Sequence, residues 1–125
     1  MARKDQEKGF TLIELLVVIT VIGVLVGIVF RELTIYQARA FDARAEHDLR
    51  VAVAAEEAFF SENEEYIECA DTTCEELLGN LELSDGIRLT MTPTEEGDGF
   101  EGVAYHPKGE KRYRFTTESG VLRAL

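Results

Sequence analysis

The chain has 125 residues, two of them cysteine and none tryptophan, and its 24 acidic and 13 basic side chains give a formal charge of −11 at neutral pH. That length accommodates one domain of ordinary size. Because so acidic a surface repels phosphate backbones, direct nucleic acid binding is not expected.

The apolar residues are concentrated near the N-terminus. Residues 10–30 read FTLIELLVVITVIGVLVGIVF, and Glu14 is the sole charge among them. As a helix this run would be about 31 Å long, enough to cross the hydrocarbon core of a membrane. A cleaved secretory signal is disfavoured, because the A-x-A-like triplet at 38–40 lies well beyond the apolar run. The basic flank before the run favours a cytoplasmic N-terminus.

Glu14 is unusual in such a segment. A carboxylate in hydrocarbon costs on the order of 3 kcal/mol on insertion scales, so a function and a partner are expected for it. Residues 8–15 read KGFTLIEL, in which a short basic leader ends in Gly9, Phe10 follows, and Glu14 is the fifth residue of the apolar run. This pattern resembles the type IV prepilin signature.

The resemblance to bacterial type IVa pilins extends through residues 36–40 and 58–66, with Glu46 and Leu49 between them, and covers roughly the first half of the chain. It implies that a membrane aspartyl prepilin peptidase cuts between Gly9 and Phe10 and methylates the new amine of Phe10. Residues 1–9 are then a removed leader, and residues 10–30 are the transmembrane and filament-core helix.

Cleavage creates a cation at Phe10, and this cation and the Glu14 carboxylate compensate each other at that depth. Two arrangements stay open: a pair within one helix, or the arrangement favoured in the family, in which Glu14 of one subunit meets the amine of its neighbour. Phe10 and Glu14 are therefore the predicted assembly residues.

Gly23 and Gly27 form a GxxxG spacing, which favours close helix packing or local unwinding equally, with chance spacing as a third alternative. Pilins of this class commonly have a proline just after the apolar run. Here residues 30–32 read FRE, so a proline kink is not carried over.

Residues 31–61 are predicted to continue the helix as an amphipathic segment. Apolar residues recur at helical spacing, including Phe41, Ala45 and Leu49, whereas Asp42 and its charged neighbours are assigned to other faces. Residues 62–86 are a connecting loop, and residues 87–125 alternate in a way that predicts an antiparallel sheet of three strands, with 121–125 as a fourth. The expected fold class is α+β: a long N-terminal helix packed on a small antiparallel β-sheet of 3–4 strands.

Cys69 and Cys74 lie in the connecting loop. An even pair exported to an oxidising periplasm tends to form a bridge, so we expect a disulfide that contributes roughly 2 kcal/mol. Zinc is not expected, because His47 and His106 are far away in sequence. The acidic residues of 95–101 lack EF-hand spacing, so a solvated hairpin loop is favoured over a calcium site.

No catalytic constellation accompanies the two histidines, so the sequence predicts neither an enzyme nor a cofactor. Aromatic residues of the helix are assigned to packing in preference to electron conduction, which has been proposed for some short-headed pilins.

The chain is thus interpreted as the structural subunit of a type IV pilus, a homo-oligomeric helical filament. The resemblance implies an inner-membrane precursor, an assembly platform and motor as partners, and an extracellular filament of a bacterium for adhesion, surface motility and DNA uptake. Two alternatives stay open: a minor pilin or type II secretion pseudopilin, and a single-span membrane-anchored binding module.

Overall fold

The structure is a computed structural model and describes residues 8–125, so most of the predicted leader lies outside the described residues. The fold is α+β, as predicted. Its elements, in chain order, are α1 (Leu12–Asn63), β1 (Cys69–Ala70), α2 (Thr72–Leu78), β2 (Arg88–Pro93), β3 (Phe100–Tyr105), β4 (Arg112–Thr116) and β5 (Leu122–Ala124). The chain divides after Ile35 into two compact units, which are described separately.

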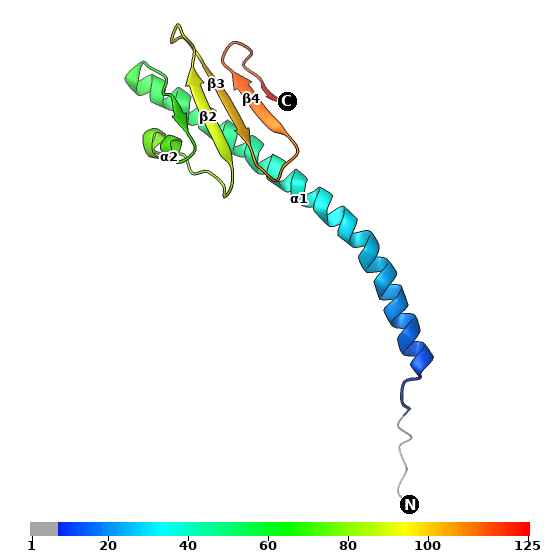
Figure 1. The fold of residues 1–125 in the computed structure, drawn as a ribbon. Coiled ribbons are helices and arrows are strands. Elements are labelled where there is room, and N and C mark those ends of the chain that lie inside the picture. The colour runs from blue at the N-terminus through cyan, green and yellow to red at the C-terminus, as the bar shows by residue number, and fades with distance from the viewer. Residues whose placement is uncertain (1–7) are drawn as a thin grey trace, which may run out of the picture. The chain divides into compact units, whose positions relative to one another are not determined.

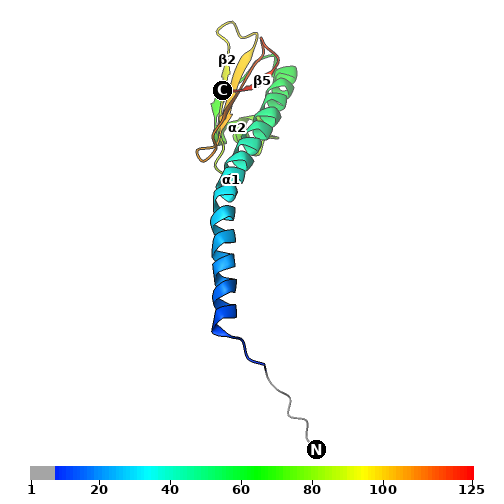
Figure 2. The same cartoon turned by 90° about the vertical axis from the view of Figure 1, so that its right-hand side faces the viewer.

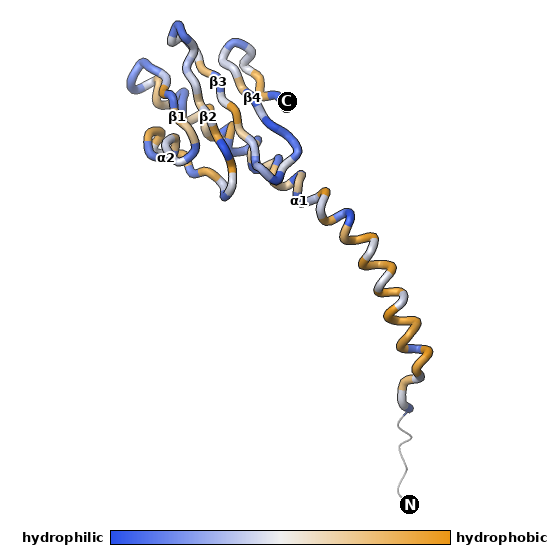
Figure 3. Tube along the Cα trace, in the orientation of Figure 1, coloured by the Kyte–Doolittle hydropathy of each residue, from blue (hydrophilic) through white to orange (hydrophobic). Residues whose placement is uncertain are grey.

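The first unit is the apolar N-terminal part of α1. Figure 3 shows an almost continuous hydrophobic tube along this segment, and every side chain from Leu12 to Ile35 is exposed. The helix is unbroken at Gly23 and Gly27, where an added Cβ would meet no atom within 4 Å. By length and composition, α1 is apolar enough to cross a membrane.

The second unit is a globular head, in which a sheet packs on the remainder of α1. The strands follow the order β1-β2-β3-β4-β5, and each neighbouring pair is antiparallel. Figures 1 and 2 show the sheet covering one side of the helix. Every second side chain of a strand faces α1. These side chains form the core together with Ala45, Leu49 and Ala52, which lie in the predicted apolar stripe of the helix.

The sheet approaches α1 closely at Gly102 of β3. A Cβ on this residue would lie 2.9 Å from both Leu49 Cδ1 and Met91 Sδ, closer than side chains pack. Leu49, Met91 and Phe100 are almost completely buried around this point. Each side chain of this size contributes about 1.5–3 kcal/mol when removed from water, so the centre of the head is held by the contact between β3 and α1.

The structure corrects the prediction of three or four strands, because the sheet has five. The additional strand, β1, consists of only Cys69 and Ala70, which pair with Met91 and Thr90 of β2. Residues 87–125 supply the other four strands. The predicted loop of residues 62–86 also contains a short helix, α2. A two-residue strand and a seven-residue helix are too short to produce a hydrophobic period in the sequence.

Candidate processing and assembly site

The predicted processing site lies just before α1. Gly9 and Phe10 are both outside the helix and exposed, and 89% of the Phe10 surface is accessible. The bond between them is therefore reachable in a segment that has no regular secondary structure. Cleavage and methylation at this bond stay predictions of the sequence.

Glu14 completes a capping box at the start of α1. The Glu14 carboxylate Oε2 accepts hydrogen bonds from the Thr11 backbone N–H (2.9 Å) and the Thr11 hydroxyl (3.0 Å). In return the Thr11 hydroxyl oxygen accepts the Glu14 backbone N–H at 3.3 Å. This reciprocal pattern satisfies amide groups that a helix N-terminus otherwise leaves unpaired, and a carboxylate in the first turn also complements the helix dipole.

The capping box bears directly on the choice of partner for Glu14. Both hydrogen bonds from Thr11 use Oε2, and Oε1 accepts none from the described residues. Glu14 therefore has a local structural role in its own chain and a second oxygen open to another partner. The sequence analysis missed Thr11, although the T-x-x-E spacing of residues 11–14 is the sequence signature of this motif.

The helix surface next to Glu14 is apolar and has no covering partner within the described chain. Phe10, Leu12 and Ile13 are each more than two-thirds exposed, and other large apolar side chains up to Tyr36 are exposed as well. A continuous apolar surface of this extent indicates a lipid or protein partner.

Within the head, buried carboxylates of α1 bind loops of the sheet. Asp42 Oδ1 accepts the backbone N–H groups of Glu110 and Lys111 at 2.9 and 3.0 Å. Asp48 accepts the backbone N–H of Ser84 at 2.7 Å and its hydroxyl at 3.1 Å. The prediction that Asp42 occupies a face other than the apolar stripe is wrong, because only 5% of its surface is exposed and its carboxylate caps the β3–β4 loop.

Glu56 is a third buried carboxylate, located two turns further along α1. Its Oε1 accepts the backbone N–H of Ile67, while Oε2 has no hydrogen-bond partner among the described residues. Burial raises the pKa of Glu56; the Ile67 hydrogen bond opposes this rise and the neighbouring Glu57 adds to it. Burial is also the main cause of a raised pKa of the Tyr113 hydroxyl on β4, and Glu46 and Asp42 add to it.

The predicted disulfide is confirmed: Cys69 of β1 and Cys74 of α2 are bridged, with their Cα atoms 5.0 Å apart. Between them Asp71 has a positive φ of 47°. Its carboxylate accepts the Leu89 backbone N–H at 3.0 Å and pairs with the Arg88 guanidinium at 2.9 Å. The bridge and Asp71 together attach α2 to β2.

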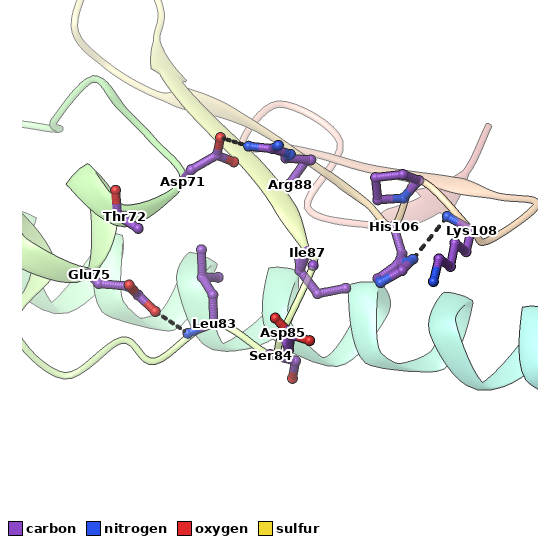
Figure 4. A pocket seen from close by; sticks show the side chains of 12 residues that line it. Asp71, Thr72, Glu75, Leu83, Ser84, Asp85, Ile87, Arg88, His106 and Lys108 are labelled. Carbon is purple, nitrogen blue, oxygen red and sulfur yellow. Dashed lines mark hydrogen bonds and ion pairs between the residues drawn. The ribbon is translucent and has the colours of Figure 1, made fainter.

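A cleft of about 540 Å³ is bordered by Asp71 and the start of α2, by the residues that precede β2, and by the residues that follow β3. Figure 4 shows that several of its polar side chains have partners within the protein: Asp71 binds Arg88, Glu75 accepts from the Leu83 backbone N–H, and His106 accepts from the Lys108 backbone N–H. His106 is also stacked on Phe41, with ring centroids 4.0 Å apart. These contacts give the cleft a structural role, and no nucleophile and base are hydrogen-bonded to each other within it among the described residues.

The acidic loop and the aromatic residues singled out in the sequence form no ligand site among the described residues. The acidic loop between β2 and β3 closes on itself through a hydrogen bond from the Thr94 hydroxyl to the Asp98 carboxylate, 2.8 Å long. Among residues 8–125, no group of three potential metal ligands is assembled. Phe60, Tyr66, Phe100 and Phe115 form a series of ring contacts 4.3 to 5.5 Å apart, which packs the end of α1 against the sheet.

An exposed apolar helix with a capped N-terminal carboxylate, followed by a small α+β head, defines a class of protein that is anchored or assembled through its N-terminal helix. Residues 4–30 match the family model of the prokaryotic N-terminal methylation motif. The chain is also similar to the type IV major pilin protein PilA of Myxococcus xanthus (strain DK1622), with 36% identity over 66 residues.

That similarity covers 53% of this chain and 30% of the length of the Myxococcus protein, so the chain matches less than a third of its relative. The methylation motif, at residues 4–30, contains the capping box and most of the apolar part of α1. Type IV pilins are therefore proteins to which the N-terminal methylation motif and this similarity relate the chain.

Proposed function

We propose that this chain is the structural subunit of a type IV pilus. The precursor is held in the inner membrane by residues 10–30, is cleaved between Gly9 and Phe10, and enters an extracellular filament through α1. The observation that carries the proposal is the start of α1, where an exposed non-helical Gly9-Phe10 bond directly precedes a capped apolar helix. A prepilin peptidase requires this access to the backbone.

In this proposal the peptidase, the assembly platform and the motor are the partners of the chain, which has no catalysis of its own. Adhesion, surface motility and DNA uptake are activities of the filament. Gly23 and Gly27 lie at the surface of the apolar helix, where they serve either close approach of neighbouring helices in the filament or local unwinding of the helix.

The mass of the protein in filaments sheared from cells tests this proposal. The expected result is an abundant chain that begins at Phe10 and carries one added methyl group. Abundance at the level of the main filament component distinguishes a major subunit from a minor pilin or pseudopilin. A chain that keeps its leader and stays in the membrane fraction contradicts the proposal and favours a membrane-anchored binding module.

Gly9→Val should block maturation, because a branched side chain before the cut bond hinders approach to the backbone. Gly9→Ala is the matched control, since it adds one methyl group and should retain a large part of the processing. Equal recovery of chains beginning at Phe10 from Gly9→Val and from the wild type would contradict this role for Gly9.

The partner of Glu14 is tested by comparing it with Thr11. If Glu14 compensates the Phe10 amine of a neighbouring subunit, Glu14→Ala leaves a buried cation unpaired at a cost of about 3–5 kcal/mol for every subunit added. Thr11→Val removes only the cap, which costs about 0.5–2 kcal/mol, and leaves the carboxylate in place. Glu14→Ala should therefore be made, cleaved and retained in the membrane but assemble poorly, whereas Thr11→Val should assemble.

Immunoblots of sheared filaments and membranes measure both outcomes. Glu14→Gln should be partly defective, because it keeps one acceptor but loses the charge. Equal loss of filaments in Thr11→Val and Glu14→Ala would show that capping of α1, and not a pair between subunits, is the function of Glu14.

A further inference from the structure

The charges of the head are separated along the sequence. Residues 51–87 contain eleven acidic residues and no lysine, arginine or histidine. Residues 88–125 contain six acidic and six basic residues. The excess negative charge of the head therefore belongs to the end of α1 and the segments between it and β2, and not to the main strands.

Arginines are concentrated on the outer face of the sheet at β4 and β5. Arg114 is directly opposite Arg123 in the antiparallel register, and Arg112 is two residues from Arg114 on the same face. All three are exposed. Like charges directly opposite each other destabilise a strand pair, so this arrangement is not explained by the stability of the sheet.

This group of arginines, called here the arginine face (Arg112, Arg114, Arg123), is only partly neutralised within the chain. Arg114 pairs with Glu101 at 2.6 Å. Arg112 lies over the Tyr105 ring, 4.4 Å from its centroid, which holds the guanidinium in place without neutralising it. Within residues 8–125, neither Arg112 nor Arg123 forms an ion pair.

A complementary surface is present beside the opposite edge of the sheet. Four exposed carboxylates occur within seven residues immediately before β1, and none of them forms an ion pair within the described residues: Glu62, Glu64, Glu65 and Glu68. Because β1 and β5 are the two edge strands, the arginine face and this acidic segment belong to opposite sides of the head.

We propose that the arginine face binds the acidic segment Glu62–Glu68 of a second copy of this chain. The guanidinium group binds carboxylates through two parallel hydrogen bonds, which suits arginine for this contact. The contact uses different surfaces on the two copies, so it repeats from copy to copy, and a rotation that does not close into a ring gives an open helical assembly. This inference rests on the proposed function, because it describes a contact between heads of neighbouring subunits in the filament.

A second copy suits the arginine face better than a long polyanion such as DNA. A polyanion that follows the surface of the head meets the acidic residues of 51–87, whose charge repels it. A second copy instead places its own acidic segment against the arginines and lowers the repulsion between heads that each carry excess negative charge.

Charge reversal in the full chain tests the contact. Arg112→Glu/Arg123→Glu should lower the yield of sheared filaments about tenfold, which is the effect of weakening two exposed ion-pair contacts at each subunit. Glu64→Arg/Glu65→Arg should lower it by a similar factor. Combining all four substitutions in one chain should restore the yield, because the two charges exchange places.

Lys108→Glu/Lys111→Glu is the matched control, since it reverses two basic residues of the β3–β4 loop and changes the net charge equally. Its yield should stay near that of the wild type. Equal losses in the control and in Arg112→Glu/Arg123→Glu, or no recovery in the fourfold variant, would overturn the proposal.

Two further measurements separate the possible failures. The mass of each precursor and mature chain reports cleavage, so a wild type that is uncleaved or forms no filaments contradicts the proposed function itself. Normal filaments from Arg112→Glu/Arg123→Glu that have lost binding of double-stranded DNA, measured against wild-type filaments, would overturn binding of a second copy and assign the arginine face to a polyanion.

Discussion

Glu56→Gln is expected to stabilise the head at neutral pH. Glu56 is completely buried, one of its oxygens accepts the Ile67 backbone N–H, and the other has no partner among the described residues. Burial raises the pKa of this carboxyl above its ordinary value of 4.5. The ionised form is therefore less favourable in the folded protein than in the unfolded chain.

The sign of the pH dependence follows from this difference. A carboxyl group with a raised pKa binds its proton more tightly in the folded state, so its contribution to stability is complete below the unfolded pKa and is lost as the pH rises through the folded pKa. Each unit of pKa difference corresponds to about 1.4 kcal/mol. Glutamine keeps the oxygen that accepts from Ile67 but has no charge to bury, so a higher free energy of unfolding is expected at neutral pH.

Urea unfolding of the fragment that begins at Arg31, measured from about pH 4 to about pH 8, tests this reasoning. The stability of the unmodified fragment should fall relative to Glu56→Gln as the pH rises. Glu62→Gln is the matched control, because Glu62 is exposed near the end of α1 and a surface substitution changes stability by less than about 0.5 kcal/mol. A Glu56→Gln fragment that is less stable at neutral pH would show that the ionised carboxylate is the better partner for Ile67.

Three further predictions concern the head. Deleting residues 1–30 should leave a soluble monomer with a cooperative unfolding transition and an intact disulfide, and aggregation of this fragment would contradict the assignment of its core. Asp48→Ala should lower the free energy of unfolding by about 2–4 kcal/mol, because it removes both acceptors of Ser84, whereas Ser84→Ala should cost only about 1 kcal/mol. Replacing Cys69 and Cys74 together by serine should cost about 2 kcal/mol, as expected for a short loop, and circular dichroism during urea titration measures this loss.

The long helix and its buried stripe were predictable from the sequence because their signals are local. Apolar residues such as Ala45 and Leu49 repeat at helical spacing, and no proline or glycine interrupts the second half of α1. The four strands after residue 87 alternate clearly enough to be predicted, although the last one, β5, is shorter in the structure than the predicted range 121–125.

The missed features depend on contacts between distant residues. Hydropathy separates the charged Asp42 from the apolar stripe, whereas its carboxylate Oδ1 accepts from backbone groups 68 and 69 residues away. Strand β1 is defined by pairing with β2, and nothing in the sequence of Cys69 and Ala70 announces it. At the candidate assembly site Glu14 stands out in the sequence as an isolated charge, whereas the role of Thr11 lies in its spacing to Glu14 and not in its own hydropathy.

The buried carboxylates of α1 attach several loops of the head to the helix, but the β2–β3 loop is not among them. Asp42, Asp48 and Glu56 bind the β3–β4 loop, the segment before β2 and the exit of α1, so changes of length in those segments would disturb the docking of helix and sheet. The β2–β3 loop is closed by its own hydrogen bonds, and Gly97 within it is exposed with no atom near its Cβ position. A peptide epitope inserted at Gly97 would therefore display a foreign sequence on each subunit without breaking an attachment between the head and α1.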